Sequence, residues 1–475
     1  MSSDATSGAA RPRTLGELRA AGITVRPVRE EMRRNLLAKL AQRERLLPGI
    51  IGFDDTVIPE IENALLAGHH MVFLGERGQA KSRIIRALTG LLDEAIPAIE
   101  GCPLHDDPYG PICKACRTRV EQEGDAVPIV WIGREARYGE KLATPDASVA
   151  DLIGEVDPIK VAEGRYLADE ETIHYGLVPR SNRGLFAINE LPDLTEKVQV
   201  GLFNLMEEKD VQIKGYKIRL PLDVVIVASA NPEDYTSRGR IITPLKDRFD
   251  VQIRTHYPRT LAHEIAIMEQ ELPPIDRGGR AVHVPDFLKQ IIAQVTFEAR
   301  ACAEINQASG VSVRVTINNY ESVLSNAEKR AVRNGESEIV PRLSDLHALH
   351  ASTAGKIEIE YAAEERTESD IIERLVNRAI LAVFDEQLKM EDLAPVVAHF
   401  EAGWGVEVSD AMPAQDYLEG VEKIPGLREA VHHLGPYESP GFIAAASELI
   451  FEGLHLHQKL NRDGEGTRWS YKAQP

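Results

Sequence analysis

A short apolar run, MVFL at residues 71–74, leads directly into the segment GERGQAKS at 75–82 and then into a helical pattern at 83–92. This order of strand, glycine-rich loop and helix is the setting that a P-loop requires. Successive backbone N–H groups of such a loop, together with the N-terminus of the helix, surround phosphate groups. The sequence therefore predicts an ATP site. Its expected binding residues are Gly75, Glu76, Arg77, Gly78, Gln79, Ala80, Lys81 and Ser82.

Within this loop, Lys81 is expected to reach the β and γ phosphates, and the Ser82 hydroxyl is expected to bind Mg²⁺. The glycine that usually precedes the lysine is replaced by Ala80. If this position needs a positive φ, the methyl group costs about 1–2 kcal/mol of strain, whereas a negative φ would make it harmless. A chance glycine-rich turn is the alternative to a P-loop, but the flanking strand and helix favour nucleotide binding.

A second strand end is expected to face the same nucleotide. The apolar run LFAI at 185–188 is followed by Asn189 and Glu190, and open α/β sheets place ligands at the carboxyl ends of their strands. Glu190 would orient and polarise the attacking water. Asn189 stands where an aspartate usually supports Mg²⁺, so it would help Ser82 to hold the ion with an oxygen but without a charge. Slow hydrolysis is one expectation from this change.

The next apolar run, VVIVASA at 224–230, ends at Asn231. Its amide is placed to hydrogen-bond the γ-phosphate or the attacking water. Two alternatives stay open. Asn231 could simply cap the turn before Pro232, and Glu190 could be a solvated carboxylate at a strand end.

Apolar strand-like runs alternate with helical stretches from residue 49 to about 258, and they include MVFL, IVWI at 129–132, LFAI, VVIVASA and VQIRTHY. This alternation predicts an α/β core of three layers, with a mainly parallel five-stranded sheet between helices. Residues 1–48 are expected to form a disordered tail and a helical lead-in, in which Thr14 and Glu17 make a capping pattern. Amphipathic patterns predict a helical lid at 259–390 and a helical C-terminal region at 391–475.

The quoted motifs resemble those of a known family. Together with GERGQAKS, the chain contains DLIGEVDPIKVAEGR, HYGLVPRSNRGLFAINELPDL, LMEEKDVQIKGYKIRLPLDVVIVASANPEDY and ITPLKDRFDVQI. This series resembles the I subunit of magnesium chelatase and its MoxR-like relatives, which are AAA+ ATPases. The resemblance covers roughly residues 49–258, with a weaker likeness to about residue 335. It implies a sheet in the AAA+ strand order and a hairpin at about Asp210 to Leu220.

The resemblance also implies roles for three further residues and an assembly. Asn231 would be the first sensor, Arg248 an arginine finger for the ATP of a neighbouring subunit, and Arg314 the second sensor on the lid. A guanidinium suits phosphate because it stays charged and offers a planar fork of donors. An ion pair with Asp247 or Asp250 is the alternative for Arg248. The implied assembly is a homo-oligomeric ring, a hexamer, with a protein partner that carries a von Willebrand A-type domain.

A cluster of metal-binding residue types lies at about 100–120, between the P-loop helix and the following strand. Its two halves, C-x2-H and C-x2-C, supply Cys102, His105, Cys113 and Cys116. This spacing is typical of a structural, tetrahedral zinc site in a knuckle. An iron–sulfur cluster is a second interpretation, and two buried cysteines in an ordinary surface loop are a third.

The formal net charge of −19 disfavours broad electrostatic binding to nucleic acid or to an anionic membrane. No apolar run approaches the roughly 18 residues that span a bilayer, and the first residues lack the apolar stretch of a secretory signal. The sequence therefore predicts a cytoplasmic protein.

Three functions are compatible with these features. The preferred hypothesis is an ATP-hydrolysing ring that remodels or activates a partner protein in metal insertion or protein maturation, and a subunit that inserts Mg²⁺ into protoporphyrin is one version of it. A nucleotide-gated scaffold or regulator with little hydrolysis is the alternative. A sigma-factor activator is disfavoured, because neither a GAFTGA-like loop nor a helix-turn-helix pattern is found.

Overall fold

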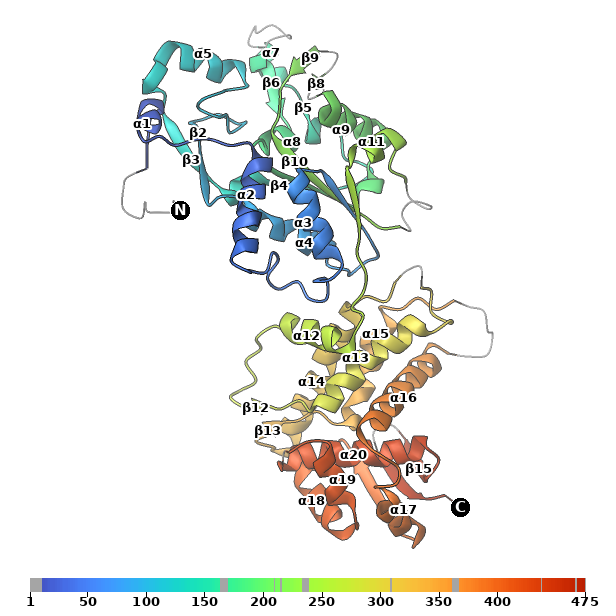
Figure 1. Ribbon diagram of the computed structural model, residues 1–475. Coiled ribbons are helices and arrows are strands. Elements are labelled where there is room, and N and C mark those ends of the chain that lie inside the picture. Colours follow the sequence, from blue (N-terminus) through green and yellow to red (C-terminus); the bar gives the residue numbers. More distant parts are fainter. Residues whose placement is uncertain are drawn as a thin grey trace. The chain divides into compact units, whose positions relative to one another are not determined.

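The computed structural model describes residues 11–162, 170–208, 210–213, 216–232, 239–307, 310–360, 367–436, 438–465 and 468–474. The chain forms two compact units (Figure 1). The first consists of Met1–Glu76 and Ala80–His256, and the second of Tyr257–Pro475 together with the loop residues Arg77–Gln79. The expected tail at residues 1–10 lies outside the described residues. Parts of two quoted motifs also lie outside them, at 163–165 in one motif and at 209, 214–215 and 233–235 in the other.

A five-stranded parallel sheet forms the centre of the first unit, in the order β11-β1-β10-β7-β4. Its strands are β1 (Met71–Leu74), β4 (Tyr138–Leu142), β7 (Gly184–Asn189), β10 (Val224–Ala230) and β11 (Val251–Arg254). The predicted parallel α/β core is therefore confirmed. Strands β7 and β10 are buried along their whole length, which explains why both read as continuous apolar runs.

One of the runs expected in this sheet lies elsewhere. The IVWI segment forms β3 (Ile129–Gly133), which pairs with β2 (Ala95–Ile99) in a separate antiparallel ribbon. Only its first residue is fully buried. The edge position of the sheet is taken by β4, whose sequence YGEKL is polar and partly exposed. An edge strand does not need two apolar faces, so its sequence carries a weaker signal.

Alternate residues of the sheet strands belong to two different hydrophobic cores. Phe73 and Leu185 pack with helices α2, α3 and α4 on one face, whereas Val72 and Phe186 pack with helix α9 and its neighbours on the other. This alternation gives three layers. The helices of the first unit are α1 (Leu15–Ala20), α2 (Val28–Ala41), α3 (Val57–Ala67), α4 (Lys81–Ala87), α5 (Lys114–Glu123), α6 (Val149–Leu152), α7 (Pro158–Ala162), α8 (Leu177–Arg180), α9 (Glu196–Glu208) and α11 (Thr243–Arg248).

Two short antiparallel pairs complete the first unit. One joins β5 (Gly154–Val156) to β6 (Ile173–Tyr175). The other, β8 (Asp210–Ile213) with β9 (Tyr216–Arg219), is a hairpin at the place where the family resemblance implies one. At the N-terminal end of the unit, the Thr14 hydroxyl caps α1 by accepting the Glu17 N–H.

The second unit is mainly helical but also contains a sheet. Its helices are α12 (Leu261–Glu271), α13 (Asp286–Ala301), α14 (Arg314–Asn334), α15 (Leu349–Ala354), α16 (Glu368–Gln387), α17 (Ala394–Glu401), α18 (Ala414–Lys423), α19 (Leu427–His433) and α20 (Pro440–Leu456). Its strands are β12 (Ala281–Val282), β13 (Glu338–Ile339), β14 (Gly405–Ser409), β15 (Leu460–Glu465) and β16 (Arg468–Ala473). The last three form an antiparallel sheet in the order β14-β16-β15, so the C-terminal region is not helical throughout as predicted. These strands mix charged and apolar residues, which hides them in a hydropathy pattern.

One hydrophobic core runs through the second unit, from Met268 in α12 to Tyr471 in β16, and therefore extends across residue 390. The division into a lid and a C-terminal region at that position stays a prediction. None of the helices in the described ranges is long and apolar enough to cross a membrane.

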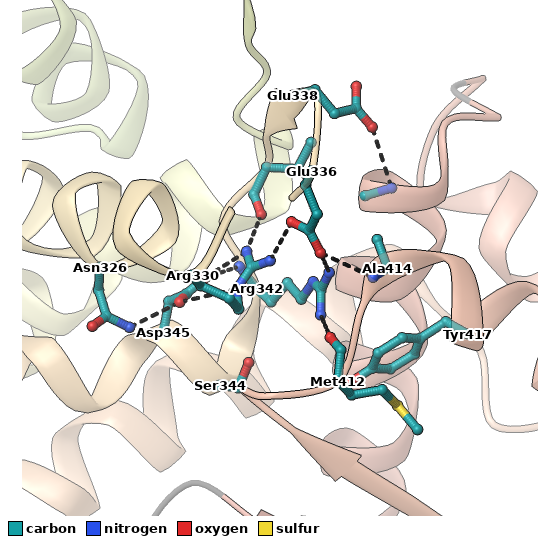
Figure 2. Close-up of polar contacts among 12 residues, drawn as sticks. Asn326, Arg330, Glu336, Glu338, Arg342, Ser344, Asp345, Met412, Ala414 and Tyr417 are labelled. Carbon is teal, nitrogen blue, oxygen red and sulfur yellow. Dashed lines mark hydrogen bonds and ion pairs between the residues drawn. The ribbon is translucent and has the colours of Figure 1, made fainter. Parts of the chain in front are cut away.

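A buried network of charges lies beside this core (Figure 2). Arg330 pairs with Asp345 at 3.0 Å and with Glu336 at 2.8 Å, and Glu336 also pairs with Arg342 at 2.7 Å. Arg342 donates a hydrogen bond to the Met412 carbonyl at 2.9 Å. Glu336 also accepts the backbone N–H of Ala414, the first residue of α18. The network thus ties α14 to the chain that enters α18.

Candidate nucleotide-binding site

The loop at 75–80 leaves the carboxyl end of β1, which lies between β10 and β11 in the sheet. Helix α4 begins at Lys81, directly after the loop. Lys81 is 8% exposed, and its ammonium group donates to the carbonyl of Gly75 and, at 2.7 Å, to that of Glu76. The lysine therefore lies along the loop that is expected to surround the phosphates.

Ala80 adopts a left-handed backbone conformation, with φ 56° and ψ 14°. The positive φ is the condition under which the departure from glycine costs free energy, about 1–2 kcal/mol. Its carbonyl accepts the Ile84 N–H at 2.9 Å, so the conformation also starts α4. The strained residue is thus part of the geometry that presents Lys81 and Ser82.

Ser82 and Asn189 meet at the strand ends. The Ser82 hydroxyl donates to Oδ1 of Asn189 at 3.1 Å, and the Ser229 hydroxyl donates to the same oxygen at 3.3 Å. On its other side, the Asn189 amide nitrogen donates to Oε1 of Glu140 at 2.5 Å. Because a carboxylate only accepts hydrogen bonds, this contact fixes the amide with its oxygen toward Ser82. Two neutral oxygens, one hydroxyl and one amide, thus lie side by side, and such oxygens are suitable Mg²⁺ ligands.

Glu140 was not predicted from the sequence. It lies on β4, in register with Ala187 of β7, and Arg86 of α4 holds both of its oxygens at 2.8 and 2.9 Å. The hydrogen bonds from Arg86 lower the pKa of Glu140, so the carboxyl group stays ionised near neutral pH. A carboxylate thus lies one hydrogen bond away from Asn189, but its charge is paired with that of Arg86. The sequence signal for Glu140 is weak, because it is only a glutamate in a strand that lies beside the end of β7.

Glu190 and Asn231 follow the ends of neighbouring parallel strands, β7 and β10. Glu190 has a left-handed backbone, with φ 57° and ψ 46°, and its N–H donates to the Ser229 hydroxyl at 3.3 Å. Asn231 is 1% exposed. Strained conformations of residues other than glycine are concentrated at functional sites. The predicted residues Ser82, Asn189, Glu190 and Asn231 thus come from adjoining elements at one edge of the sheet.

The two arginines with implied roles lie on other elements. Arg248 ends α11, where it pairs with Glu207 of α9 and lies 4.0 Å from Asp247. Of the two carboxylates considered as partners, Asp250 instead accepts the His70 N–H. Arg314 is the exposed first residue of α14, in the second unit. The roles of both arginines stay predictions.

The expected metal ligands lie in the segment from the end of β2 to the first turn of α5, and the set of four stays a prediction. Cys102, Cys113 and Cys116 come together with Asp106, so that one potential ligand atom from each lies within 4.8 Å of the others. His105 is not in this group. Its backbone is left-handed, with φ 49°, and the next residue, Asp106, is the one that reaches the cysteines.

Comparison with known proteins gives sequence relatives that include several magnesium-chelatase subunits. No protein-family model matches the chain. The magnesium-chelatase subunit ChlI of Anabaena variabilis is 29% identical over 204 residues, which are 42% of this chain and 56% of the relative. The magnesium-chelatase 38 kDa subunits of Acidiphilium rubrum and Rhodobacter capsulatus are 30% and 28% identical, over 41% and 46% of this chain and 54% and 59% of the relatives. The chain thus spans little more than half the length of the curated relatives it matches.

Solved structures with some likeness include a complex between the magnesium-chelatase subunits BchI and BchD, at 19% identity and a TM-score of 0.35, covering 68% of this chain and 98% of that one. A putative ATPase from Cytophaga hutchinsonii has 16% identity and a TM-score of 0.31, with 76% of this chain and 97% of that chain covered. Over about two fifths of its length the chain is thus similar in sequence to magnesium-chelatase I subunits, and it combines this similarity with a glycine-rich loop that follows a strand of a parallel five-stranded sheet.

Proposed function

We propose that this chain, an AAA+ protein related to the I subunit of magnesium chelatase, binds and hydrolyses Mg·ATP in order to remodel or activate a partner protein. One observation carries the proposal. The P-loop residue Ser82 is hydrogen-bonded to Asn189 at 3.1 Å, and Asn189 is directly followed by Glu190. The groups that we assign to phosphate, metal and water thus lie together near the carboxyl ends of the parallel strands.

Each residue has a defined task in this proposal. Backbone N–H groups of the loop and the Lys81 ammonium bind the phosphates, while Ser82 and Asn189 hold Mg²⁺ with their oxygens. The bound ion neutralises the negative charge that develops on the phosphate oxygens. Glu190 orients the attacking water and accepts its proton. Asn231 hydrogen-bonds the γ-phosphate or the water, Arg248 acts on the nucleotide of a neighbouring subunit, and Arg314 acts from the lid.

Calorimetry and phosphate release test the proposal together. We expect the full chain to bind Mg·ATP, and Lys81→Ala to lose that binding. Glu190→Gln keeps the loop intact, so it should bind nucleotide normally and lose at least about 100-fold in hydrolysis, as expected for a general base. Glu196→Gln, at the exposed start of α9, is the matched control and should change neither property. Absence of Mg·ATP uptake at millimolar nucleotide would exclude the proposal.

A nucleotide-gated regulator with little turnover is the second candidate, and two observations favour it. Asn189 removes a charge from the metal site, and Ala80 puts strain into the loop. Glu140 does not restore a net negative charge near Asn189, because its carboxylate is paired with the guanidinium of Arg86. If the wild-type protein releases phosphate no faster than Glu190→Gln while both bind Mg·ATP, the regulator is the correct description.

The assembly is part of the same proposal. Support comes from the similarity to magnesium-chelatase subunits, one of which forms a complex with a second subunit in a solved structure. We propose a hexameric ring and a protein partner with a von Willebrand A-type domain, acting in protein maturation or in magnesium insertion into a porphyrin. Native mass spectrometry of Glu190→Gln with Mg·ATP should show closed rings, and a purely monomeric spectrum would contradict the ring.

The cysteine-rich segment supports a further part of the proposal, a structural zinc ion. Three cysteines of one loop converge in the first unit. An ion held by four protein ligands has no open coordination position, so it would stabilise the fold and take no part in ATP hydrolysis.

A further inference from the structure

Three cysteine sulfurs converge where the loop after β2 meets the N-terminus of α5. Sγ of Cys102 lies 4.0 Å from Sγ of Cys113, and Cys116 follows within the first turn of α5. A disulfide needs sulfurs about 2.05 Å apart, so this pair is not bonded. Two thiolates on a tetrahedral zinc ion, each about 2.3 Å from the metal, lie about 3.8 Å apart. The observed spacing therefore fits ligands that share one ion.

Backbone N–H groups already orient two of these sulfurs. The Leu104 N–H donates to Sγ of Cys102 at 3.4 Å, and the Cys116 N–H donates to Sγ of Cys113 at 3.3 Å. Donors directed at a sulfur stabilise the thiolate form, which is the form that binds metal. The loop is thus folded around the sulfurs in the way that a metal knuckle requires.

The fourth donor is Asp106. This residue has 0% exposure, and its Oδ2 accepts the N–H groups of Ile112 and Cys113 at 3.2 and 3.0 Å. Its other oxygen, Oδ1, is buried without a hydrogen-bond partner among the described residues, and so is Nδ1 of His105, so proximity to the sulfurs separates the two candidates. A buried carboxylate oxygen that lacks a partner is costly, and metal coordination is one of the two ways in which proteins compensate a buried charge. Asp106 also lies within the same 4.8 Å group as the three sulfurs.

We propose that Cys102, Asp106, Cys113 and Cys116 bind one Zn²⁺ ion, and that His105, which the C-x2-H spacing suggests, is not a ligand. Three thiolates and one carboxylate make a closed, tetrahedral set of ligands that zinc accepts. An iron–sulfur cluster fits less well, because its cysteines bind different iron atoms and must lie farther apart than four donors within 4.8 Å.

The ion would also brace the strand that carries Asn189 and Glu190. Asn182 donates to the Leu104 carbonyl at 2.8 Å, and Arg183 donates to the His105 carbonyl at 3.1 Å. Gly184, the next residue, begins β7. The metal loop is therefore hydrogen-bonded to the N-terminal end of the strand whose carboxyl end forms the nucleotide site.

Metal analysis of the full chain tests this assignment. We expect one zinc per chain by mass spectrometry, and a Co²⁺-substituted protein whose sulfur-to-cobalt absorption corresponds to three thiolates. Asp106→Asn should weaken zinc at least about 10-fold in chelator competition, whereas His105→Ala, the matched control from the adjacent position, should bind as the wild type does. The reverse pattern would make His105 the ligand and overturn the proposal.

The Cys113→Ser variant tests whether zinc binding can be lost while the protein still folds. If this variant folds, it should lose the zinc, and full metal content in it would refute the ligand set. If it does not fold, the wild-type protein is used instead. A chelator should then release one zinc per chain, and replacement of that zinc by Co²⁺ should give the expected sulfur-to-cobalt absorption. A wild-type protein that binds neither zinc nor cobalt overturns the site. Mg·ATP binding is measured separately, so failure of the zinc site and failure of the ATPase are distinguishable.

Discussion

Single residues decide how well the P-loop works, and Ala80 is the clearest case. The sequence shows an alanine where glycine is usual, but only the backbone angle tells whether the change matters. At φ 56° an alanine pays a steric penalty that a glycine does not. This penalty is local, so it can be measured without disturbing the side chains that meet the nucleotide.

Ala80→Gly should therefore stabilise the protein. We expect a gain of about 1 kcal/mol in the free energy of unfolding, because the relief of strain exceeds the extra chain entropy of glycine. Urea unfolding measures the gain, and Ala87→Gly in the last turn of α4 is the opposite control, since glycine there should lower stability. Equal losses in both variants would show that the left-handed conformation of Ala80 is not strained.

The residue scale also shows what sequence alone misses. The residues of the P-loop and of the two strand ends follow from local motifs, because each motif is contiguous in the chain. Glu140 could not be found in this way, since its contact with Asn189 joins positions that are 49 residues apart. Asp106, which we propose as the fourth zinc ligand, was not predicted for another reason. Ligand spacing favoured its neighbour His105, and only the course of the backbone places the carboxylate beside the sulfurs.

At the scale of elements, the start of β1 is fixed by a buried histidine. His70 accepts the Ile226 N–H of β10 through Nδ1 at 3.0 Å, and its own N–H donates to Asp250 at 2.8 Å, next to β11. Its Nε2 lies 2.7 Å from the Arg29 guanidinium. Burial, followed by the charge of Arg29, lowers the pKa of His70 to about 4, against a smaller opposing effect of Asp250. The strand junction therefore requires a neutral imidazole.

This lowered pKa predicts a loss of stability in mild acid. Between about pH 6.5 and 4 the unfolded chain binds a proton at His70 that the folded chain does not, so stability falls as the pH falls through this window. The full effect is about 3 kcal/mol. Urea unfolding of His70→Asn, which keeps an acceptor near the Nδ1 position, should show a smaller drop from pH 7.5 to 5.5 than the wild type. Parallel curves for the two proteins would exclude His70 as the cause.

Elements were predicted well where burial is two-sided. Strands β1, β7 and β10 were found from their apolar runs, and the layers follow from them. The outer strand β11 was also found, although only Ile253 of this strand is buried. Two partly exposed strands, β3 and β4, were not assigned correctly. The apolar run of β3 belongs to a ribbon outside the sheet, and the polar β4 closes the sheet edge in its place. Strands β14, β15 and β16 were not predicted either, because their mixture of charged and apolar residues gives no clear strand pattern in a region with helical patterns.

At the scale of the whole molecule, the buried network in the second unit links segments that are distant in the sequence (Figure 2). Asp345 is 0% exposed and accepts hydrogen bonds from Asn326, from Arg330 and from the backbone of Arg342. Together with Glu336 it balances the two buried arginines. Removal of one charge from such a set leaves the opposite charge buried and uncompensated.

Asp345→Asn should therefore destabilise the second unit by about 3 kcal/mol or more. Calorimetric unfolding measures the effect as a lower transition temperature. Glu407→Gln is the matched control, because Glu407 pairs with Arg468 at 2.8 Å on the surface, where both side chains are more than half exposed, and its transition should stay almost unchanged. Equal shifts of the transition temperature in the two variants would mean that the buried network stabilises the protein no more than a surface ion pair does.

In the C-terminal sheet β14 and β15 are the outer strands, on either side of β16. Outer strands of a sheet can in general pair with a foreign strand, which is a usual route to aggregation. Charged side chains occupy both outer strands, Glu407 on β14 and Arg462 and Asp463 on β15. Such charges discourage strand addition. We therefore expect copies of this chain to associate through surfaces other than this sheet.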